Sequence, residues 1–360
     1  MKLSLDRRGF VTGAAATSVG LAVGGRQVLA ADPLKVGFIY VGPKSDNGWT
    51  YRHDVGRLEI EKALPGKVTT SFVENVPEGP DAERVIRQLA TSGHGLIFAT
   101  SFGFMNPMVK VAKAFPKIKF EHATGYQTAD NLAVYNARFY EGRAVIGTIA
   151  GHLSKSGVIG YIGSFPIPEV VMGINAFTLA AQKVNPKIKT VVVWVNSWHD
   201  PGKEADAAKT LIDQGCDILS QHTDSAAPLQ IAEQRGVYGF GQAADQRAFA
   251  AKGQLTAIID NWSKYYVERT KAVLDDSWKT HSVWHGLKEG MVEMAEYGPG
   301  VTPEVAKAAD AVKSGIIAGT LHPFTGPIKN QKGEVKTAAG KTIDDGELAK
   351  MDWYVEGVQA

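Results

Sequence analysis

The sequence predicts an α/β protein built from two doubly wound lobes, each with a parallel sheet covered by helices and joined to the other by a hinge. Short apolar runs alternate with stretches of helical periodicity through the first half of the chain, and the alternation begins again after residue 153. Apolar runs bounded by turn residues are typical of parallel strands whose two faces are both buried. A chain of 360 residues is long enough for two such lobes.

The first half begins with an apolar strand at 36–41, which stops at Gly42-Pro43. A helix is expected at 51–64 because apolar side chains recur there at the helical period, and Pro65-Gly66 ends it. Asp81 stands in the N-cap position of the next helix. The other elements expected are strands at 68–73, 95–100 and 118–122, helices at 81–92 and 108–115, and a short extended piece at 134–136.

The second half repeats this order after a long helix at 142–153. We expect strands at 157–162, 190–195, 218–222, 237–241 and 256–259, with helices at 170–183, 204–214 and 229–235. The tail is less regular, with helices at 262–278 and 302–314 around a stretch at 282–294 that fits an extended conformation. We expect it to cross back between lobes, so that one lobe holds residues 31–136 with about 260–285 and the other 137–259 with about 286–360.

Residues 1–30 have the features of an export signal. Arg7-Arg8 precede an apolar run of small residues that is too short to span a bilayer, and Val28-Leu29-Ala30 suits a signal peptidase. The paired arginines favour the twin-arginine route, with an ordinary secretory signal as the alternative. The single cysteine, Cys216, lies far from this segment, so neither a lipid anchor nor an internal disulfide is expected. A soluble periplasmic protein is predicted.

Charge and residue spacing exclude two classes of function. The chain has 39 Lys and Arg against 37 Asp and Glu, which implies no basic face for nucleic acid. No group of His, Cys and carboxylate residues has the spacing of metal ligands, and neither a metal nor a cofactor is expected.

The candidate binding residues lie in the loops that leave the predicted strands. Open parallel sheets bind ligands at the carboxyl edge of their strands, and two facing lobes would direct these loops into one cleft. Aromatic rings in the loops can stack on a planar ligand, which contributes about 1–3 kcal/mol for each ring. Amides and carboxylates can pair with the ligand's edge. The set is Asp46, Asn47, Trp49, Ser101, Phe102, Phe165, Trp198, Asp224, Gln242, Asp260, Asn261 and Trp262.

Two patterns typical of enzymes are weaker. The segment 239–244 follows a strand and is similar to a dinucleotide fingerprint, but the βαβ unit that should follow is missing. The segment around Ser101 is similar to a nucleophile elbow without its first glycine. A periplasmic hydrolase that uses Ser101 stays open as an alternative, although no convincing base accompanies this serine. We therefore expect no enzyme.

Six longer segments together resemble the basic membrane protein (Bmp) family of ABC-transporter substrate-binding proteins. They are GFIYVGPKSDNGW at 37–49, FATSFGFMNPMVKVAKAFPKIKF at 98–120, YEGRAVIGTIAG at 140–151, the loop 198–201, LIDQGCDILSQHTDS at 211–225 and FTGPIKNQKG at 324–333. The resemblance covers nearly all of the mature chain. It implies a hinged, two-lobed fold of the type I periplasmic-binding kind, which closes around a purine nucleoside or a related purine.

Carried over by position, the resemblance implies that Trp49 and Trp198 are opposed stacking aromatics. Asn106 stands where nucleoside-binding relatives carry an Asp that faces the purine edge, and an amide, which both donates and accepts, suits adenine. Those relatives also carry an Asp and a Lys on the ribose side, where this chain has Gln242 and the segment 260–262. We expect a free purine base, adenine first, with a purine nucleoside as the alternative.

The resemblance also implies the partners. We expect a monomer that hands its purine to an ABC permease in the inner membrane and performs no chemistry on it. A ligand-sensing partner of a membrane receptor would share the fold and the binding step, so the sequence leaves that alternative open.

Overall fold

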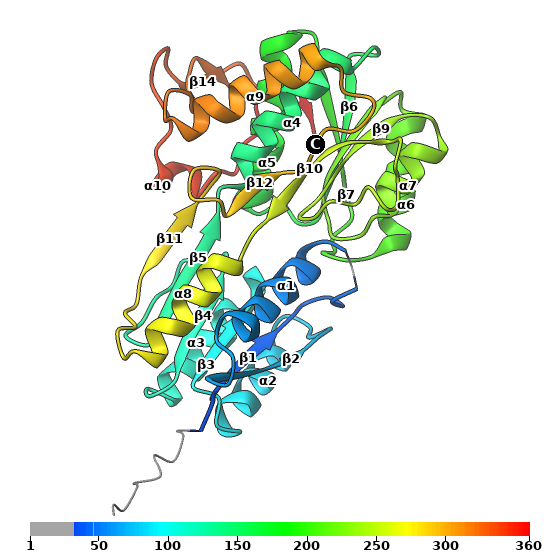
Figure 1. Ribbon diagram of the computed structural model, residues 1–360. Coiled ribbons are helices and arrows are strands. Elements are labelled where there is room, and N and C mark those ends of the chain that lie inside the picture. Colours follow the sequence, from blue (N-terminus) through cyan, green and yellow to red (C-terminus); the bar gives the residue numbers. More distant parts are fainter. Residues whose placement is uncertain (1–31, 46) are drawn as a thin grey trace, which may run out of the picture. The chain divides into compact units, whose positions relative to one another are not determined.

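Two sheets organise the part of the chain that the computed structural model describes, residues 32–45 and 47–360 (Figure 1). The predicted export signal and Asp46 lie outside these residues. Pro33–Ala360 forms one compact unit. None of the helices described here is long and apolar enough to span a membrane.

The first sheet has six strands in the order β11-β5-β4-β3-β1-β2, and every neighbouring pair is parallel. The strands are β1 (Leu34–Ile39), β2 (Val68–Val73), β3 (Leu96–Ala99), β4 (Lys119–Ala123), β5 (Leu132–Ala137) and β11 (Ser282–His285). The helices of this lobe are α1 (Trp49–Ala63), α2 (Pro80–Thr91), α3 (Met105–Ala114) and α8 (Ser263–Leu274), with the short 3-10 helix η1 (Phe102–Phe104). We call this sheet with its helices the first lobe.

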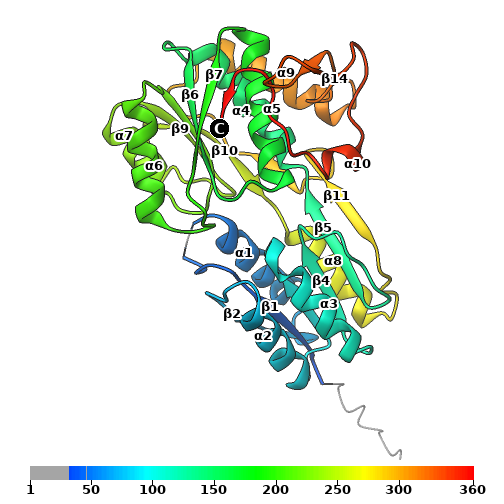
Figure 2. The same cartoon turned by 180° about the vertical axis from the view of Figure 1, so that it is seen from behind.

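Alternate side chains of β1 enter different hydrophobic layers. Phe38 packs with the layer that holds α1 and α8, whereas Ile39 packs with the layer that holds α2 and α3. Successive side chains of a strand point to opposite faces of the sheet. Because both faces are buried here, the buried positions on both faces are apolar and the sequence of the strand contains a continuous apolar run. Helices therefore cover both faces of the first sheet (Figure 2).

The second sheet has seven strands in the order β12-β10-β9-β8-β6-β7-β15. The strands are β6 (Val158–Gly163), β7 (Lys189–Trp194), β8 (Ile218–His222), β9 (Tyr238–Gly241), β10 (Gln254–Asp260), β12 (Val292–Met294) and β15 (Val358–Gln359). Only β12 runs antiparallel to its neighbour in this sheet. The helices are α4 (Phe139–Leu153), α5 (Pro168–Val184), α6 (Pro201–Asp213), α7 (Ala227–Gln234) and α9 (Pro303–Ile317). This sheet with its helices is the second lobe.

The two faces of the second sheet are also covered. Tyr161 of β6 packs with α4 and α5, whereas Ile162 packs with α6 and α7. A small antiparallel pair, β13 (Ile328–Lys329) and β14 (Val335–Thr337), and the short helix α10 (Asp345–Leu348) complete the tail.

Within the described residues, the chain passes between the lobes at three places. It passes from β5 to α4, from β10 to α8, and from β11 to β12. The tail beyond Asp260 thus adds a helix and a strand to the first lobe before it returns to the second. Three adjacent connections are typical of a hinge that lets two lobes close on a ligand.

Three details differ from the expectations. Helix α2 begins at Pro80 after the N-cap residue Gly79, so Asp81 lies in its first turn and not at the N-cap. Helix α1 begins at Trp49 and not at 51, so the indole stands in the first turn of a helix rather than in a loop. The stretch 282–294 is not one extended segment, because Met291 and Val292 donate backbone hydrogen bonds to Gly286 and make a turn between β11 and β12. That turn sends the two strands into different sheets.

Candidate functional site

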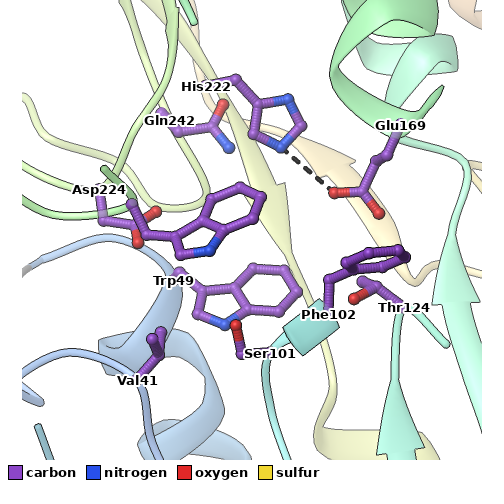
Figure 3. Close-up of a pocket in the computed structure, with 10 residues that line it drawn as sticks. Val41, Trp49, Ser101, Phe102, Thr124, Glu169, His222, Asp224 and Gln242 are labelled. Atoms are coloured by element: carbon purple, nitrogen blue, oxygen red, sulfur yellow. Dashed lines mark ion pairs between the residues drawn. The ribbon is translucent and has the colours of Figure 1, made fainter. Parts of the chain in front are cut away.

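Residues from both lobes line one pocket at the carboxyl ends of the strands (Figure 3). Its empty volume, which includes space open to solvent, is about 350 Å³. The first lobe contributes Val41, Trp49, Ser101, Phe102 and Thr124, and the second contributes Glu169, Trp198, His222, Asp224 and Gln242. Six of these ten residues belong to the set predicted from the exit loops.

Trp49 is held on several sides. Its Nε1 donates a hydrogen bond to the Thr100 carbonyl oxygen at 2.7 Å. The indole meets His53 edge-on at a centroid distance of 4.4 Å and Trp262 at 5.4 Å. His53 in turn stacks on Trp262 at 4.7 Å with an interplanar angle of 9°. The first lobe therefore holds this ring in position through a hydrogen bond and a packed aromatic cluster.

Trp198 has a different environment. It lies in the loop between β7 and α6 and contacts Phe165 at a centroid distance of 5.1 Å, and His222 at 6.5 Å. Its Nε1 is buried and has no hydrogen-bond partner among the residues that the structure describes. A buried donor without a partner is costly, which makes this N–H a candidate donor to a ligand.

Glu169 and His222 form a pair in the second-lobe wall, where the His222 side chain is buried and the Glu169 side chain is 13% exposed. Glu169 Oε1 lies 3.4 Å from His222 Nε2, and Glu169 stands in the first turn of α5, where the helix dipole favours a carboxylate. Burial lowers the pKa of His222, against the opposing effect of the hydrogen bond to Glu169. The neutral imidazole therefore donates its Nε2–H to the carboxylate. Glu169 Oε2 is buried without a partner in the described chain, and it is directed towards Phe102 and Thr124 (Figure 3).

A second buried polar cluster lies around Gln242. Arg143 donates to Gln242 Oε1 and, at 3.3 Å, to Ser220 Oγ. Asp260 ends β10 nearby, and burial raises the pKa of its carboxyl group well above the usual value. Arg52 donates to the Asp260 carbonyl oxygen at 2.7 Å and so connects the two lobes. Asp260 is fully buried and does not line the pocket.

The other predicted residues that the structure describes do not line the pocket. Trp262 has no exposed surface and stands behind Trp49, so it is not the ligand contact expected from the sequence. Phe165 supports Trp198. Asn106 is exposed on α3, where it accepts a hydrogen bond from Gln127, and Asn261 donates one to Glu293 at 2.8 Å.

The lobes touch each other beside the pocket. Gln246 of the second lobe donates to the Asn47 carbonyl oxygen at 3.2 Å. Next to it, a Cβ atom added at Gly48 would lie only 2.5 Å from the Asp224 carbonyl oxygen. The close approach of the lobes therefore requires glycine at position 48.

Four lining residues were missed by sequence reasoning: Val41, Thr124, Glu169 and His222. Thr124 has a positive φ of 61°, which is unusual for a β-branched residue and gathers at functional sites. His222 is the last residue of β8, and Glu169 follows Pro168 at the start of α5. Both adjoin loops that the sequence had singled out, but only the fold shows that their side chains meet.

Ser101 is not arranged as a nucleophile. Its hydroxyl donates to Glu78 Oε1 at 2.5 Å, while His122 Nε2 donates to the Ser101 carbonyl oxygen at 2.8 Å. Burial lowers the pKa of His122 to about 4. The imidazole thus binds the backbone of Ser101 and does not activate its hydroxyl, as a general base would have to do. No cluster of possible metal ligands occurs in 32–45 or 47–360.

Known proteins are similar to this chain over most of its length. A family model described as Bmp, ABC transporter substrate-binding protein PnrA-like, matches residues 34–322. A purine-binding protein of Brucella abortus (strain 2308) is 57% identical over 343 residues, which cover 95% of this chain and 97% of that protein. A Haloferax volcanii protein, named as a candidate glucose-binding protein of an ABC transporter, is 34% identical over 328 residues, covering 91% of this chain and 81% of that one.

Solved structures agree with the architecture. A solute-binding protein of an ABC transporter system from Aeropyrum pernix K1 matches with a TM-score of 0.70 at 18% identity, over 88% of this chain and 97% of that one. Another from Conexibacter woesei DSM 14684 matches with a TM-score of 0.65 at 19% identity, over 80% and 98%. The fold is that of type I periplasmic binding proteins, as predicted. With the family model matching most of its length, the chain belongs to the Bmp family of PnrA-like ABC transporter substrate-binding proteins.

Proposed function

We propose that this protein is the periplasmic solute-binding component of an ABC importer and that it captures a free purine base, adenine first. The observation that carries the proposal is that Trp49 and Trp198, one from each lobe, line the same pocket. Two indoles on opposite walls suit a flat heterocycle, because each stacked face contributes about 1–3 kcal/mol. The ligand contacts both lobes and thereby stabilises the closed state.

The purine class is supported by the Brucella abortus relative, which is named a purine-binding protein. The Haloferax volcanii relative is named for glucose, so the family alone leaves the ligand class open. A pocket that presents two indoles, one from each lobe, suits a planar base better than a sugar.

The choice of a base over a nucleoside rests on the residues that replace the expected ribose contacts. Gln242 stands in place of an Asp, and its amide oxygen is occupied by Arg143. Asp260 lies in the segment where nucleoside-binding relatives carry the Lys. Its carboxyl group is buried and does not line the pocket. Neither position offers a free charged group to sugar hydroxyls.

The remaining parts of the proposal follow from the chain's organisation. The moving bodies are residues 31–136 with about 260–285 and residues 137–259 with about 286–360. Residues 1–30 direct export, by the twin-arginine route, to the periplasm, where the mature protein acts as a monomer. The acceptor of the ligand is a permease of the inner membrane.

Isothermal titration of the purified protein tests the ligand, with adenine, hypoxanthine, adenosine, inosine, guanosine and glucose as the panel. We expect adenine to bind most tightly and the nucleosides at least tenfold more weakly. Tight binding of inosine or guanosine with no response to adenine would overturn the choice of a base, and tight binding of glucose alone would overturn the purine class. Loss of adenine uptake in cells that lack the protein tests the importer role.

A further inference from the structure

We propose that Glu169 accepts a hydrogen bond from an N–H group on the ligand's edge and thereby selects heterocycles that keep this N–H unsubstituted. The proposal rests on the proposed function and names the residue that reads the base. Sequence reasoning did not include Glu169, and the structure assigns it to the pocket wall.

The first step concerns the two oxygens of Glu169. Oε1 is engaged by His222 at 3.4 Å, while Oε2 is buried and has no partner in the described part of the chain. A carboxylate oxygen only accepts hydrogen bonds, so a ligand that reaches Oε2 must present a donor. A ligand atom that only accepts, such as an exocyclic oxygen, would face two lone pairs there and be disfavoured.

The second step concerns the charge state of Glu169. The residue lies in the first turn of α5, directly after Pro168, where unpaired backbone N–H groups favour a negative charge. His222 is neutral because it is buried, and it donates its Nε2–H to Oε1. This leaves an oriented carboxylate whose second oxygen remains free for the ligand.

The third step concerns the chemistry of the ligand. A free purine base carries an N–H on its five-membered ring, and adenine carries further N–H groups on its exocyclic amine. A nucleoside has lost the ring N–H at the position that bears the sugar. An acceptor at Glu169 that receives the ring N–H prefers a base to a nucleoside, whereas an acceptor that receives the exocyclic amine selects adenine over purines without this amine.

The surroundings of Glu169 make this inference testable with small ligand changes. Glu169, Phe102 and Thr124 also line an adjoining, wider compartment of about 1310 Å³ that is open to solvent. A methyl group added to the ligand edge that faces Glu169 therefore has room. A loss of affinity on methylation reports the lost donor and not a steric clash.

The experiment compares the full-length protein with Glu169→Gln by titration calorimetry against adenine, 9-methyladenine and N6,N6-dimethyladenine. In Glu169→Gln, the amide oxygen accepts the hydrogen bond from His222 Nε2–H. The amide NH₂ group then faces the N–H of the ligand, and two donors cannot pair. We expect adenine to bind about ten- to hundredfold more weakly. One of the two methylated ligands should bind the wild type more weakly than adenine does, and this difference should disappear in Glu169→Gln.

The matched control is Glu304→Gln. Glu304 follows Pro303 in the first turn of α9, as Glu169 follows Pro168 in α5, but it is exposed and lies outside the pocket. Glu304→Gln removes a negative charge from the first turn of α9, as Glu169→Gln does in α5. We expect it to leave the affinity for adenine unchanged. His222 acts as a positioning residue: His222→Phe should weaken adenine binding several-fold, and His222→Gln, which keeps a donor, should restore most of it.

The outcomes separate the two proposals. If the wild type binds adenine and Glu169→Gln binds it equally well, the role of Glu169 is overturned while the proposed function stands. The role of Glu169 is also overturned if Glu169→Gln lowers the affinities of all three ligands by the same factor. The carboxylate would then not depend on an N–H of the ligand. A wild type that binds no purine overturns both.

Discussion

The two walls of the pocket differ in how far their polar atoms are satisfied. On the first-lobe wall, the Trp49 indole donates to Thr100 and the Ser101 hydroxyl donates to Glu78. On the second-lobe wall, Trp198 Nε1 and Glu169 Oε2 are buried without partners within the described chain. These two donors of the first-lobe wall are thus already paired. The second-lobe wall keeps three buried atoms without partners in the described chain, because His222 Nδ1 also has none.

This difference indicates how the ligand and closure depend on each other. A preformed platform binds a flat ring by stacking without rearrangement, which limits the entropic cost of binding. Unsatisfied buried groups are costly until a ligand meets them, so the second-lobe wall gains most when the ligand is present. We infer that the first lobe captures the ring and that the second lobe identifies it.

The largest expected effect is on Trp49→Ala. We expect it to weaken adenine binding at least tenfold, which corresponds to about 1.4 kcal/mol and lies within the range of about 1–3 kcal/mol for one stacking face. It should also lower the melting temperature, since the indole packs on His53 and Trp262. Titration calorimetry and thermal unfolding measure the two effects. Trp198→Ala is the comparison, with a similar loss of affinity and a smaller loss of stability, and an unchanged affinity in Trp49→Ala would remove this residue from the site.

The next effect concerns closure. Gly48→Ala places a Cβ atom 2.5 Å from the Asp224 carbonyl oxygen of the other lobe, and relieving such an overlap costs about 1–3 kcal/mol. We expect adenine affinity to fall by about tenfold while the melting temperature without ligand stays the same. Gly202→Ala is the control, because a Cβ atom there meets only Asp200 at 3.5 Å. Equal affinities of the two variants would argue against the close approach of the lobes in the bound state.

The smallest effect is expected when Trp198 or Trp49 is replaced by another aromatic residue. Trp198→Phe keeps an aromatic ring but removes the unpartnered N–H, so affinity should fall by about two- to tenfold, the value of one hydrogen bond of 0.5–1.5 kcal/mol. Trp49→Phe removes an N–H that is already bonded to Thr100, so it should lower the melting temperature and change affinity less. If the two substitutions have the same effects, the walls do not differ in the way described.

Much of the fold was predictable because its signals are local. The apolar run that became β1 is bounded by turn residues, and its alternate side chains enter two cores in a covered parallel sheet. The restart of the pattern after residue 153 indicated the second sheet. The family, carried by several motifs together, is confirmed by the match over residues 34–322.

The site was predictable in part. Trp49, Trp198 and four other exit-loop residues line the pocket because the carboxyl edge of a parallel sheet is where such loops gather. Glu169 was missed because proline followed by an acidic residue is a common way to begin a helix and indicates no ligand. Glu304 in α9 follows its proline in the same way. Trp262 looked like a ligand contact in the same loop set, but packing placed it behind Trp49.

The α/β class, the two sheets and the family follow from the sequence alone, because strand patterns, turn residues and motifs lie in neighbouring positions. The role of Trp49 as a stacking platform stays a prediction. Only the tertiary structure decided that Glu169 meets His222, which lies 53 positions further along the chain, and that Gly48 meets Asp224 of the other lobe. The physical reason is that the pairing of side chains across a cleft depends on sheet order and lobe closure. No local pattern encodes either.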